Sequence, residues 1–280
     1  MNMILDKACC FLTTHLTQIP KIEEIVVNPN FTGVLLENQD MGMAMNIRKG
    51  VGNEAATSIK PIEDLIGFGG FSGLERLSEA NDPLMLSVRV ALINALSKPF
   101  MTAEFLQARG YETARGRDSY SIKERVKDKT VVIVGFGGNV TRIASRAAKV
   151  YVTELEPEQF YSRVFSKHGA SRGPFCATVI HARDAKPYFQ KADAVVLTGC
   201  TLVTGTMEGI LAQCRGKEVF VYGVTAGFFP EPLFDMGVEA IAPPVVTDSS
   251  GMMDALKNCG PMVERFFSES GQELFIQKNK

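Results

Sequence analysis

Residues 131 to 157 read VVIVGFGGNVTRIASRAAKVYVTELEP, and this stretch decides the class of fold. An apolar run typical of a buried strand leads directly into a glycine loop, and a helix-length segment and a second apolar strand follow. Gly135 and Gly137 match the first two glycines of G-x-G-x-x-G, whereas Val140 stands at the third position. The order of strand, glycine loop, helix and strand predicts the first half of a Rossmann-like domain.

The same stretch leaves the ligand open. Gly135 permits a tight turn and Gly137 permits close approach of the backbone to a phosphate. Glu154 lies about 20 residues further on, where an acidic side chain can reach a ribose hydroxyl. The spacing suits the shorter loop of S-adenosylmethionine-type Rossmann folds about as well as it suits a dinucleotide. A turn that binds nothing is the third alternative, so the sequence identifies no cofactor.

Apolar runs recur beyond this stretch, mostly with helix-length segments between them. They cover 131–134, 150–152, 177–180, 194–197, 219–222 and 238–241. Strands that alternate with helices predict right-handed crossovers and a mainly parallel sheet.

The N-terminal part has a different pattern. Residues 22–47 contain three short strands separated by turn residues, which predicts an antiparallel meander. A very apolar helix follows, which Asn81 or Asp82 can cap, and Asn94 within it is expected to be buried with hydrogen-bond partners. The polar segment 110–130 is interpreted as a linker. We therefore predict an α/β protein with a small α+β domain and linker in residues 1–118 and a Rossmann-like domain in residues 119–280.

Composition narrows the classes of function. The chain has 280 residues, a net charge of −1 and 45% hydrophobic residues, so neither nucleic acid nor an acidic membrane surface is an expected partner. Asp6 and Lys7 interrupt the first apolar segment, which argues against a signal peptide or a membrane span. We expect a cytoplasmic protein with free thiols. The six cysteines form no C-x-x-C pair and the three histidines are isolated, so no zinc signature is present.

Three later loops carry small polar residues at predicted strand ends, where open parallel sheets bind ligands. The first contains Thr198, Gly199, Cys200 and Thr201, the second contains Thr225, and the third contains Asp248. Hydroxyls and backbone amides in such loops suit an anionic or polar ligand. Asp248 can instead cap the helix that follows it. Cys200 stands where a nucleophile or a soft-metal ligand would stand, although a structural thiol is the alternative.

Several segments together resemble one known family. They are SVRVALINAL, VVIVGFGG, VYVTELEP, ADAVVLTGCTLVTGT and GVTAGFFPEPLFDMGVEAIAPPVVTD. The set is similar to the uncharacterised family named for heavy-metal chelation. That resemblance implies an enolase-N-terminal-like domain joined to a Rossmann-like domain, with a cleft between them.

Carried over by position, the resemblance implies site roles for Asn94, Gly135, Phe136, Glu154, Thr198, Gly199, Thr201, Thr225 and Asp248. The chain departs from the family pattern at three places. Cys200 stands where the family tends to have Ser or Thr, Thr204 where it tends to have Asn, and Val224 where it tends to have Pro.

The leading hypothesis is a protein that binds a small polar or metal-chelating molecule between its domains, in heavy-metal chelation or in chelator or cofactor metabolism. The glycine loop and the loops at Thr198–Thr201 and Thr225 would hold the anionic part, Glu154 and Asp248 a hydroxyl, amine or metal, and Asn94 would close the cleft. One rival is an enzyme that uses S-adenosylmethionine or a nicotinamide cofactor. Another is a soft-metal carrier that uses Cys200 with Asp248 and a histidine. Whether turnover occurs, and whether the chain forms a homo-oligomer, stays open.

Overall fold

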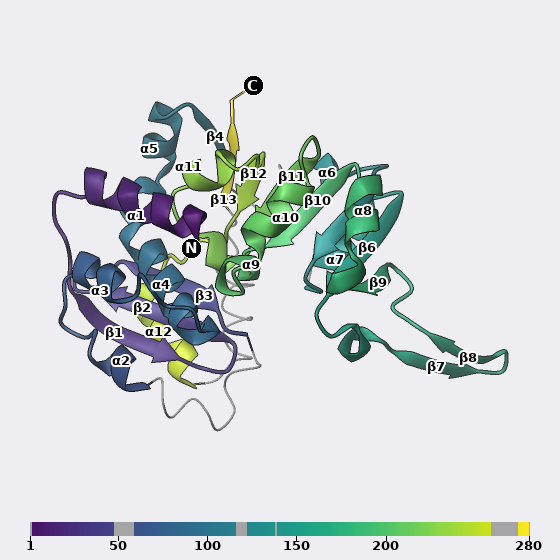
Figure 1. Ribbon diagram of the computed structural model, residues 1–280, viewed down its shortest axis with the longest axis horizontal. Helices are drawn as coiled ribbons and strands as arrows, with labels where there is room; N and C mark the ends of the chain where they lie inside the picture. Colours follow the sequence, from purple (N-terminus) through teal and green to yellow (C-terminus); the bar gives the residue numbers. More distant parts are fainter. Residues whose placement is uncertain (1, 48–58, 116–121, 138, 259–273, 280) are drawn as a thin grey trace.

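The computed structural model describes residues 2–47, 59–115, 122–137, 139–258 and 274–279. The N-terminal elements, here called the meander unit, form a three-stranded antiparallel sheet in the order β1-β2-β3 with helices packed on it (Figure 1). Its elements are α1 (Met3–His15), β1 (Ile22–Val27), β2 (Phe31–Leu36), β3 (Met41–Met45), α2 (Ile59–Glu63), α3 (Gly70–Arg76), α4 (Pro83–Leu96), the short 3₁₀ turn η3 (Lys98–Phe100) and α5 (Ala103–Ala108).

The second part, here called the Rossmann unit, is built on an eight-stranded sheet in the order β4-β13-β12-β11-β10-β5-β6-β9. Its strands from β5 to β12 pair in parallel, and β13 and β4 join in antiparallel fashion at one edge. The strands are β4 (Tyr111–Arg115), β5 (Thr130–Val134), β6 (Lys149–Glu154), β9 (Thr178–His181), β10 (Ala194–Thr198), β11 (Glu218–Tyr222), β12 (Ala240–Ala242) and β13 (Leu274–Lys278).

Short helices connect these strands. They are α6 (Ile122–Arg125), α7 (Asn139–Ala144), α8 (Lys186–Lys191), α9 (Cys200–Val203), α10 (Met207–Gln213), α11 (Glu231–Phe234) and α12 (Ser249–Asn258), with 3₁₀ turns η4 (Pro157–Phe160), η5 (Ala182–Asp184) and η6 (Val224–Ala226). Numbered along the chain, the six parallel strands lie in the order 3-2-1-4-5-6, which is the doubly wound Rossmann order. The predicted fold class is confirmed, and each predicted apolar run of this part coincides with a strand.

Local sequence signals explain where α4 begins and ends. The Asp82 side chain accepts hydrogen bonds from the backbone N–H groups of Leu84 and Met85, and Pro83 occupies the first helical position. Strand β3 packs directly on this helix at Gly42, where an added Cβ would lie 2.1 Å from the Ala91 carbonyl oxygen. This close approach requires glycine at position 42, and it fixes the part of α4 against which β3 packs.

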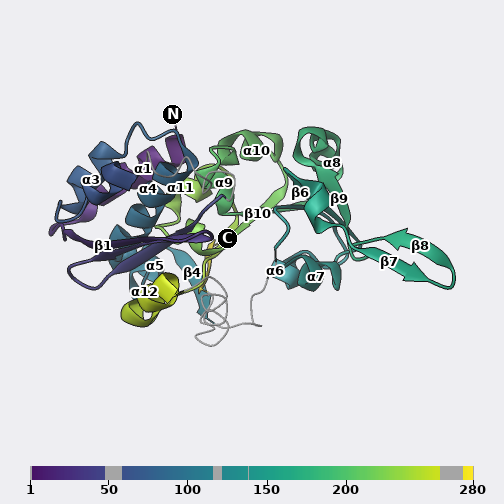
Figure 2. The ribbon, with the colours of Figure 1, turned by 90° about the horizontal axis from the view of Figure 1, so that it is seen from below.

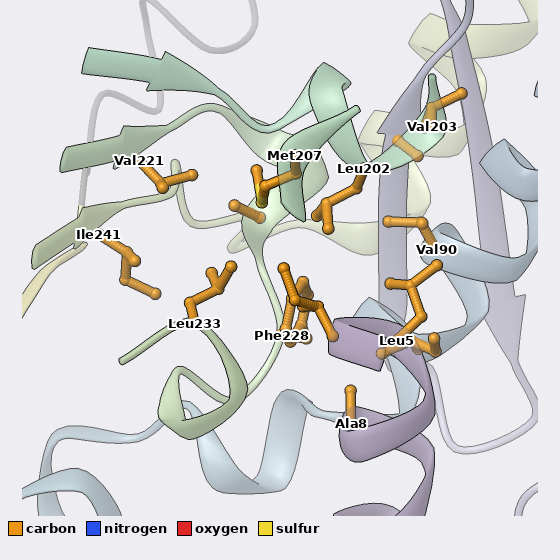
Figure 3. Packing of buried hydrophobic residues seen from close by; sticks show 14 of the residues in the cluster. Leu5, Ala8, Val90, Leu202, Val203, Met207, Val221, Phe228, Leu233 and Ile241 are labelled. Carbon is orange, nitrogen blue, oxygen red and sulfur yellow. The ribbon is translucent and has the colours of Figure 1, made fainter. Parts of the chain in front are cut away.

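The two units share one hydrophobic core. Figure 3 shows Leu5 and Ala8 of α1 and Val90 of α4 beside Phe228 and Leu202 of the Rossmann unit, and all five are buried. Alternate residues of the parallel strands face this core, while those between them face a second cluster on the other side of the sheet. The meander unit therefore packs on the short elements that follow the carboxyl ends of the parallel strands, where α4 contacts α9 and η6 and α1 contacts α11.

Two elements, β4 and α12, link the meander unit with the Rossmann unit. Strand β4 lies within the segment interpreted as a linker, yet it pairs with β13 at the edge of the large sheet and buries Tyr111. Helix α12 packs on the small sheet, where Met252, Met253 and Leu256 meet Phe31 and Leu35. Alternation of polar and apolar residues in a short edge strand is a weak signal, and for this reason β4 was not predicted.

A two-stranded antiparallel hairpin, β7 (Arg163–Ser166) with β8 (Gly169–Arg172), projects from the Rossmann unit in both views (Figures 1 and 2). Every residue of its two strands is exposed.

None of the helices in the described part of the chain is long and apolar enough to cross a membrane.

Candidate functional site

The loops after β5 and β10 meet at the point where the strand order reverses. From this point the chain runs outward through β6 and β9 on one side and through β11 and β12 on the other. Gly135 has a φ of +91°, and a Cβ added there would lie 2.8 Å from Thr198 Cγ2. Thus Gly135 and Thr198 stand at the place where open α/β sheets bind ligands.

The glycine loop is tied to the end of the next strand by Glu154. One carboxylate oxygen accepts a short hydrogen bond from the Phe136 N–H, and the other accepts the Leu155 N–H at 3.2 Å. Burial raises the pKa of Glu154, and these two N–H groups oppose the rise. The ring of Phe136 stacks on Phe160 with ring centroids 4.9 Å apart. The Glu154 side chain therefore holds the glycine loop in shape by accepting a hydrogen bond from the loop's main chain at Phe136.

Tyr222, at the end of β11, closes the other side of the loop. A Cβ added at Gly137 would lie 3.1 Å from the Tyr222 hydroxyl oxygen, so glycine leaves room for that side chain. Burial raises the pKa of Tyr222, as do the nearby Cys200 and Glu154, while a hydrogen bond with Thr198 lowers it. Sequence analysis missed Tyr222, although a polar residue that ends a buried strand was an available signal.

The loop after β10 is compact and internally hydrogen-bonded. The Thr198 hydroxyl lies 3.2 Å from Cys200 Sγ, and the Thr201 hydroxyl donates to the Thr198 carbonyl at 2.8 Å. A Cβ added at Gly199 would lie 2.8 Å from the Ala226 nitrogen, so the loop after β11 passes directly over Gly199. Burial raises the pKa of Cys200, against the opposing effects of hydrogen bonds from Thr198 and Thr225.

The meander unit reaches the carboxyl ends of the parallel strands through Asn94 and β3. The Asn94 side-chain N–H group donates to the Met43 carbonyl at 2.6 Å and to the Val224 carbonyl at 3.0 Å. The Met45 N–H donates to the Thr225 hydroxyl at 3.0 Å. The expectation that Asn94 is buried with partners is met, although its Oδ1 is buried with no hydrogen-bond partner in the described part of the chain.

A cavity of about 200 Å³ lies between the two units beside these contacts. Its charged lining residues are Lys98 and Arg115, and Asn94 lines it as well. Lys98 Nζ donates to the Val246 carbonyl at 2.9 Å. Burial lowers the pKa of Lys98, while the nearby Asp40 raises it. The remaining walls come from Met41, Gly42, Met43, Met101, Thr102, Val224, Gly227, Pro243, Pro244, Val245, Val246 and Leu274.

Asp248 has a different position from the other predicted site residues. It is exposed, and its Oδ1 accepts the Gly251 N–H at 2.9 Å at the beginning of α12. Capping was the structural alternative left open for this residue, and this contact satisfies it. The structure shows Asp248 in a capping contact. It brings the other predicted site residues together at the carboxyl ends of the parallel strands, and these are Gly135, Phe136, Gly137, Glu154, Thr198, Gly199, Cys200, Thr201, Thr225 and Asn94.

Among the described residues, no group of three or more His, Cys, Asp and Glu side chains lies close enough together to hold a metal ion. A soft donor pair is present instead, because Cys200 Sγ lies 3.2 Å from Met45 Sδ. Thiol and thioether sulfurs suit soft metal ions, whereas Mg²⁺ and Ca²⁺ require oxygen ligands. Sequence analysis missed Met45 because the packing of β3 against α9 and η6 cannot be inferred from either segment alone.

Comparisons with known families and structures agree with this architecture. Residues 119–274 match the family DUF364, and residues 13–97 match DUF4213; both are described as "Putative heavy-metal chelation". No match is found among curated proteins.

Two solved structures share the fold over almost their whole length. A protein of unknown function from the DUF364 family of Desulfitobacterium hafniense DCB-2 has a TM-score of 0.70 at 15% identity, covering 98% of both chains. A protein of unknown function from the same family of Pyrococcus horikoshii has a TM-score of 0.70 at 17% identity, covering 99% of both chains. The DUF364 match spans more than half of the sequence, and the chain belongs to the DUF364 family.

Proposed function

We propose that this protein binds a small, polar, metal-chelating ligand in the cleft between the meander unit and the Rossmann unit. The observation that carries the proposal is the cavity of about 200 Å³ whose walls come from both units. A cavity of this kind, with apolar walls and a few convergent polar groups, is typical of a small-molecule site. The family description supports a ligand connected with metal chelation.

The charges of the lining favour an anionic ligand. Lys98 and Arg115 are its charged residues, and burial has already removed much of the water around the Lys98 ammonium group. A carboxylate group placed beside Lys98 would gain a charge-assisted hydrogen bond in a site of low dielectric. The methionines and prolines of the walls would then contact the apolar body of the ligand.

Of the predicted site residues, Asn94 lines the cavity, and the others would bind the ligand from the loops at the carboxyl ends of the strands. Thr198, Thr201 and Thr225 would contribute hydroxyl and backbone groups, and the loop from Gly135 to Gly137 would contribute backbone groups. Glu154 would bind a hydroxyl, an amine or a metal ion. Asn94, which bonds to carbonyls of both units, would keep them together around the ligand. A role for Asp248 beyond capping stays a prediction.

A thermal-shift titration with citrate and with its Co²⁺ and Ni²⁺ complexes tests this function. A ligand that binds only the folded state raises the melting temperature. We expect at least one of these anionic chelators or chelates to raise the melting temperature of the wild type, and Lys98→Met to remove the increase. Lys7→Met, at a half-exposed ion pair with Asp235, is the matched control. An equal increase in both variants, or none in the wild type, would contradict the proposal.

The alternative function is an enzyme that uses S-adenosylmethionine or a nicotinamide cofactor. The strand order 3-2-1-4-5-6 and the position of Glu154 at the end of β6 favour it, because a Rossmann enzyme binds ribose with such a residue. Glu154→Ala separates the two functions in calorimetric titrations. It should abolish binding of S-adenosylmethionine or NAD under the alternative, and should only weaken binding of an anionic chelate under the leading proposal.

A further inference from the structure

The contact between Met45 and Cys200 joins two sulfur atoms from different units. Met45 is the last residue of β3, and Cys200 is the first residue of α9. Their sulfurs lie 3.2 Å apart, with the thiol directed at the thioether. The Met45 side chain is 37% exposed, so this sulfur pair can be reached from solvent.

We propose that Cys200 and Met45 form a binding site for one soft monovalent metal ion, of the type of Cu⁺ or Ag⁺. Thiolate and thioether ligands select such ions over Mg²⁺, Ca²⁺ and other hard cations. The thiol is placed to donate its proton to the thioether sulfur, and the ion would take the place of that proton. One Sγ–H bond would break, one metal–Sγ bond and one metal–Sδ bond would form, and one proton would pass to the solvent.

The surroundings of the sulfur pair favour a metal ion that carries a single positive charge. A thiolate with a monovalent ion is neutral, and a neutral pair avoids the cost of leaving net charge in a half-buried site. Thr198 and Thr225 make hydrogen bonds to the sulfur of Cys200, and such bonds stabilise a thiolate once the proton has left. The Glu154 carboxylate is close enough to act on Cys200 electrostatically and would attract a cation.

Met45 can adjust to an ion. Its side chain has three rotatable bonds and a polarizable sulfur, and it lies at the exposed end of its strand. Sδ can therefore move away from Sγ while the main chain of β3 stays bonded to Thr225. The site depends on neither Lys98 nor the cavity, so it can be tested separately from the proposed function.

The test is an equilibrium titration with Ag⁺ in chloride-free buffer, followed by native mass spectrometry and by the number of protons released. Cys200→Ser removes the thiolate, and Met45→Leu removes the thioether while nearly conserving volume at a partly exposed position. Cys176→Ser, at an exposed cysteine, is the control for loss of any one thiol. Lys98→Met separates this site from the cavity.

We expect the tightest Ag⁺ site of the wild type to fill with release of one proton and to persist unchanged in Cys176→Ser and Lys98→Met, while the other free thiols bind further Ag⁺ ions more weakly. Cys200→Ser and Met45→Leu should each weaken that ion at least tenfold. Wild-type affinity in Met45→Leu would overturn the proposal, and so would an equal loss in Cys176→Ser. Either result would leave the anionic-chelate function untouched, because that function is read from the Lys98 variant.

Discussion

Gly135 and Thr198 lie so close that a Cβ on Gly135 would be 2.8 Å from Thr198 Cγ2. Gly135 directly follows β5, and Thr198 is the last residue of the neighbouring strand β10. From β5 the chain continues to β6 on one side, and from β10 it continues to β11 on the other side. Their contact therefore marks the switch point of the sheet, and it explains why the loop needs glycine at this position for steric as well as conformational reasons.

Gly135→Ala is expected to destabilise the protein through both effects. The positive φ alone costs about 1–2 kcal/mol for an alanine, and the added methyl group costs about 1–3 kcal/mol more through overpacking. Gly110→Ala is the matched control, because Gly110 has a φ of +79° with nothing within 4 Å of the added Cβ. Urea unfolding measures both variants, and equal losses would contradict the close contact.

Asn94→Leu is expected to weaken the junction between the units. The change leaves the buried carbonyl of Met43 without its Asn94 donor, at about 1–3 kcal/mol for the unsatisfied group, while the Val224 carbonyl keeps the Gly227 N–H at 3.2 Å. The control is Asn258→Ala, whose side chain is exposed and bonds only within α12 in the described part of the chain. That control should stay within about 0.5 kcal/mol of the wild type in denaturant unfolding. A similarly small effect of Asn94→Leu would argue against its bridging role.

Leu256→Ala tests the packing of α12 on the small sheet. Leu256 is 1% exposed, and its Cδ1 would lie 2.5 Å from a Cβ added at Gly33 of β2. Removal of this side chain should cost about 2–5 kcal/mol in the free energy of unfolding. Lys257→Ala, next to it on the exposed face, removes ion pairs with Glu24 and Asp254 and should destabilise the protein far less, because exposed ion pairs contribute little to stability. If both variants lose equally little, α12 does not pack there.

Glu154 should give the stability a specific dependence on pH. Burial raises its pKa above the ordinary value of 4.5, so the folded protein keeps the proton to a higher pH than the unfolded chain. The contribution of Glu154 to the free energy of unfolding is therefore fully present below the unfolded pKa and is lost as the pH rises through the folded pKa. The stability of the wild type relative to Glu154→Gln should fall as the pH rises from about 4 to about 8. A difference that grows with pH would show the opposite shift.

Most of the fold follows from local patterns in the sequence. The six parallel strands β5, β6, β9, β10, β11 and β12 contain short apolar runs, mostly with helical segments between them, and the capping contact of Asp82 at α4 could be read directly. Strands β4 and β13 and the hairpin β7–β8 were missed. The residues of β4, β7 and β8 are mostly polar or exposed, so burial leaves no clear period in them. Strand β13 has a buried apolar run of only three residues, Leu274–Ile276, which is too short to indicate a strand.

Local sequence patterns placed site residues only within the Rossmann unit, whereas the site role of Asn94 in the meander unit was implied by the family resemblance. Residues at the ends of parallel strands meet by topology alone, which is why Gly135, Thr198 and Glu154 could be placed together. Lys98 and Met45 reach the carboxyl ends of the strands only through the packing of the meander unit, and Arg115 reaches the cavity through the pairing of β4 with β13, and no local pattern encodes either arrangement. Asp248 shows the reverse case, because a strand-end carboxylate and a helix cap have the same sequence signature.

The most direct test of ligand binding between the units is native mass spectrometry of gently purified wild type and Lys98→Met, each compared with its denatured mass. We predict a non-covalent adduct of one small anionic molecule or metal chelate per chain in the wild type, and its loss or strong depletion in Lys98→Met. Lys7→Met should keep the adduct. An unliganded wild-type mass together with no binding of added chelates, or an adduct retained equally in Lys98→Met, would contradict the account.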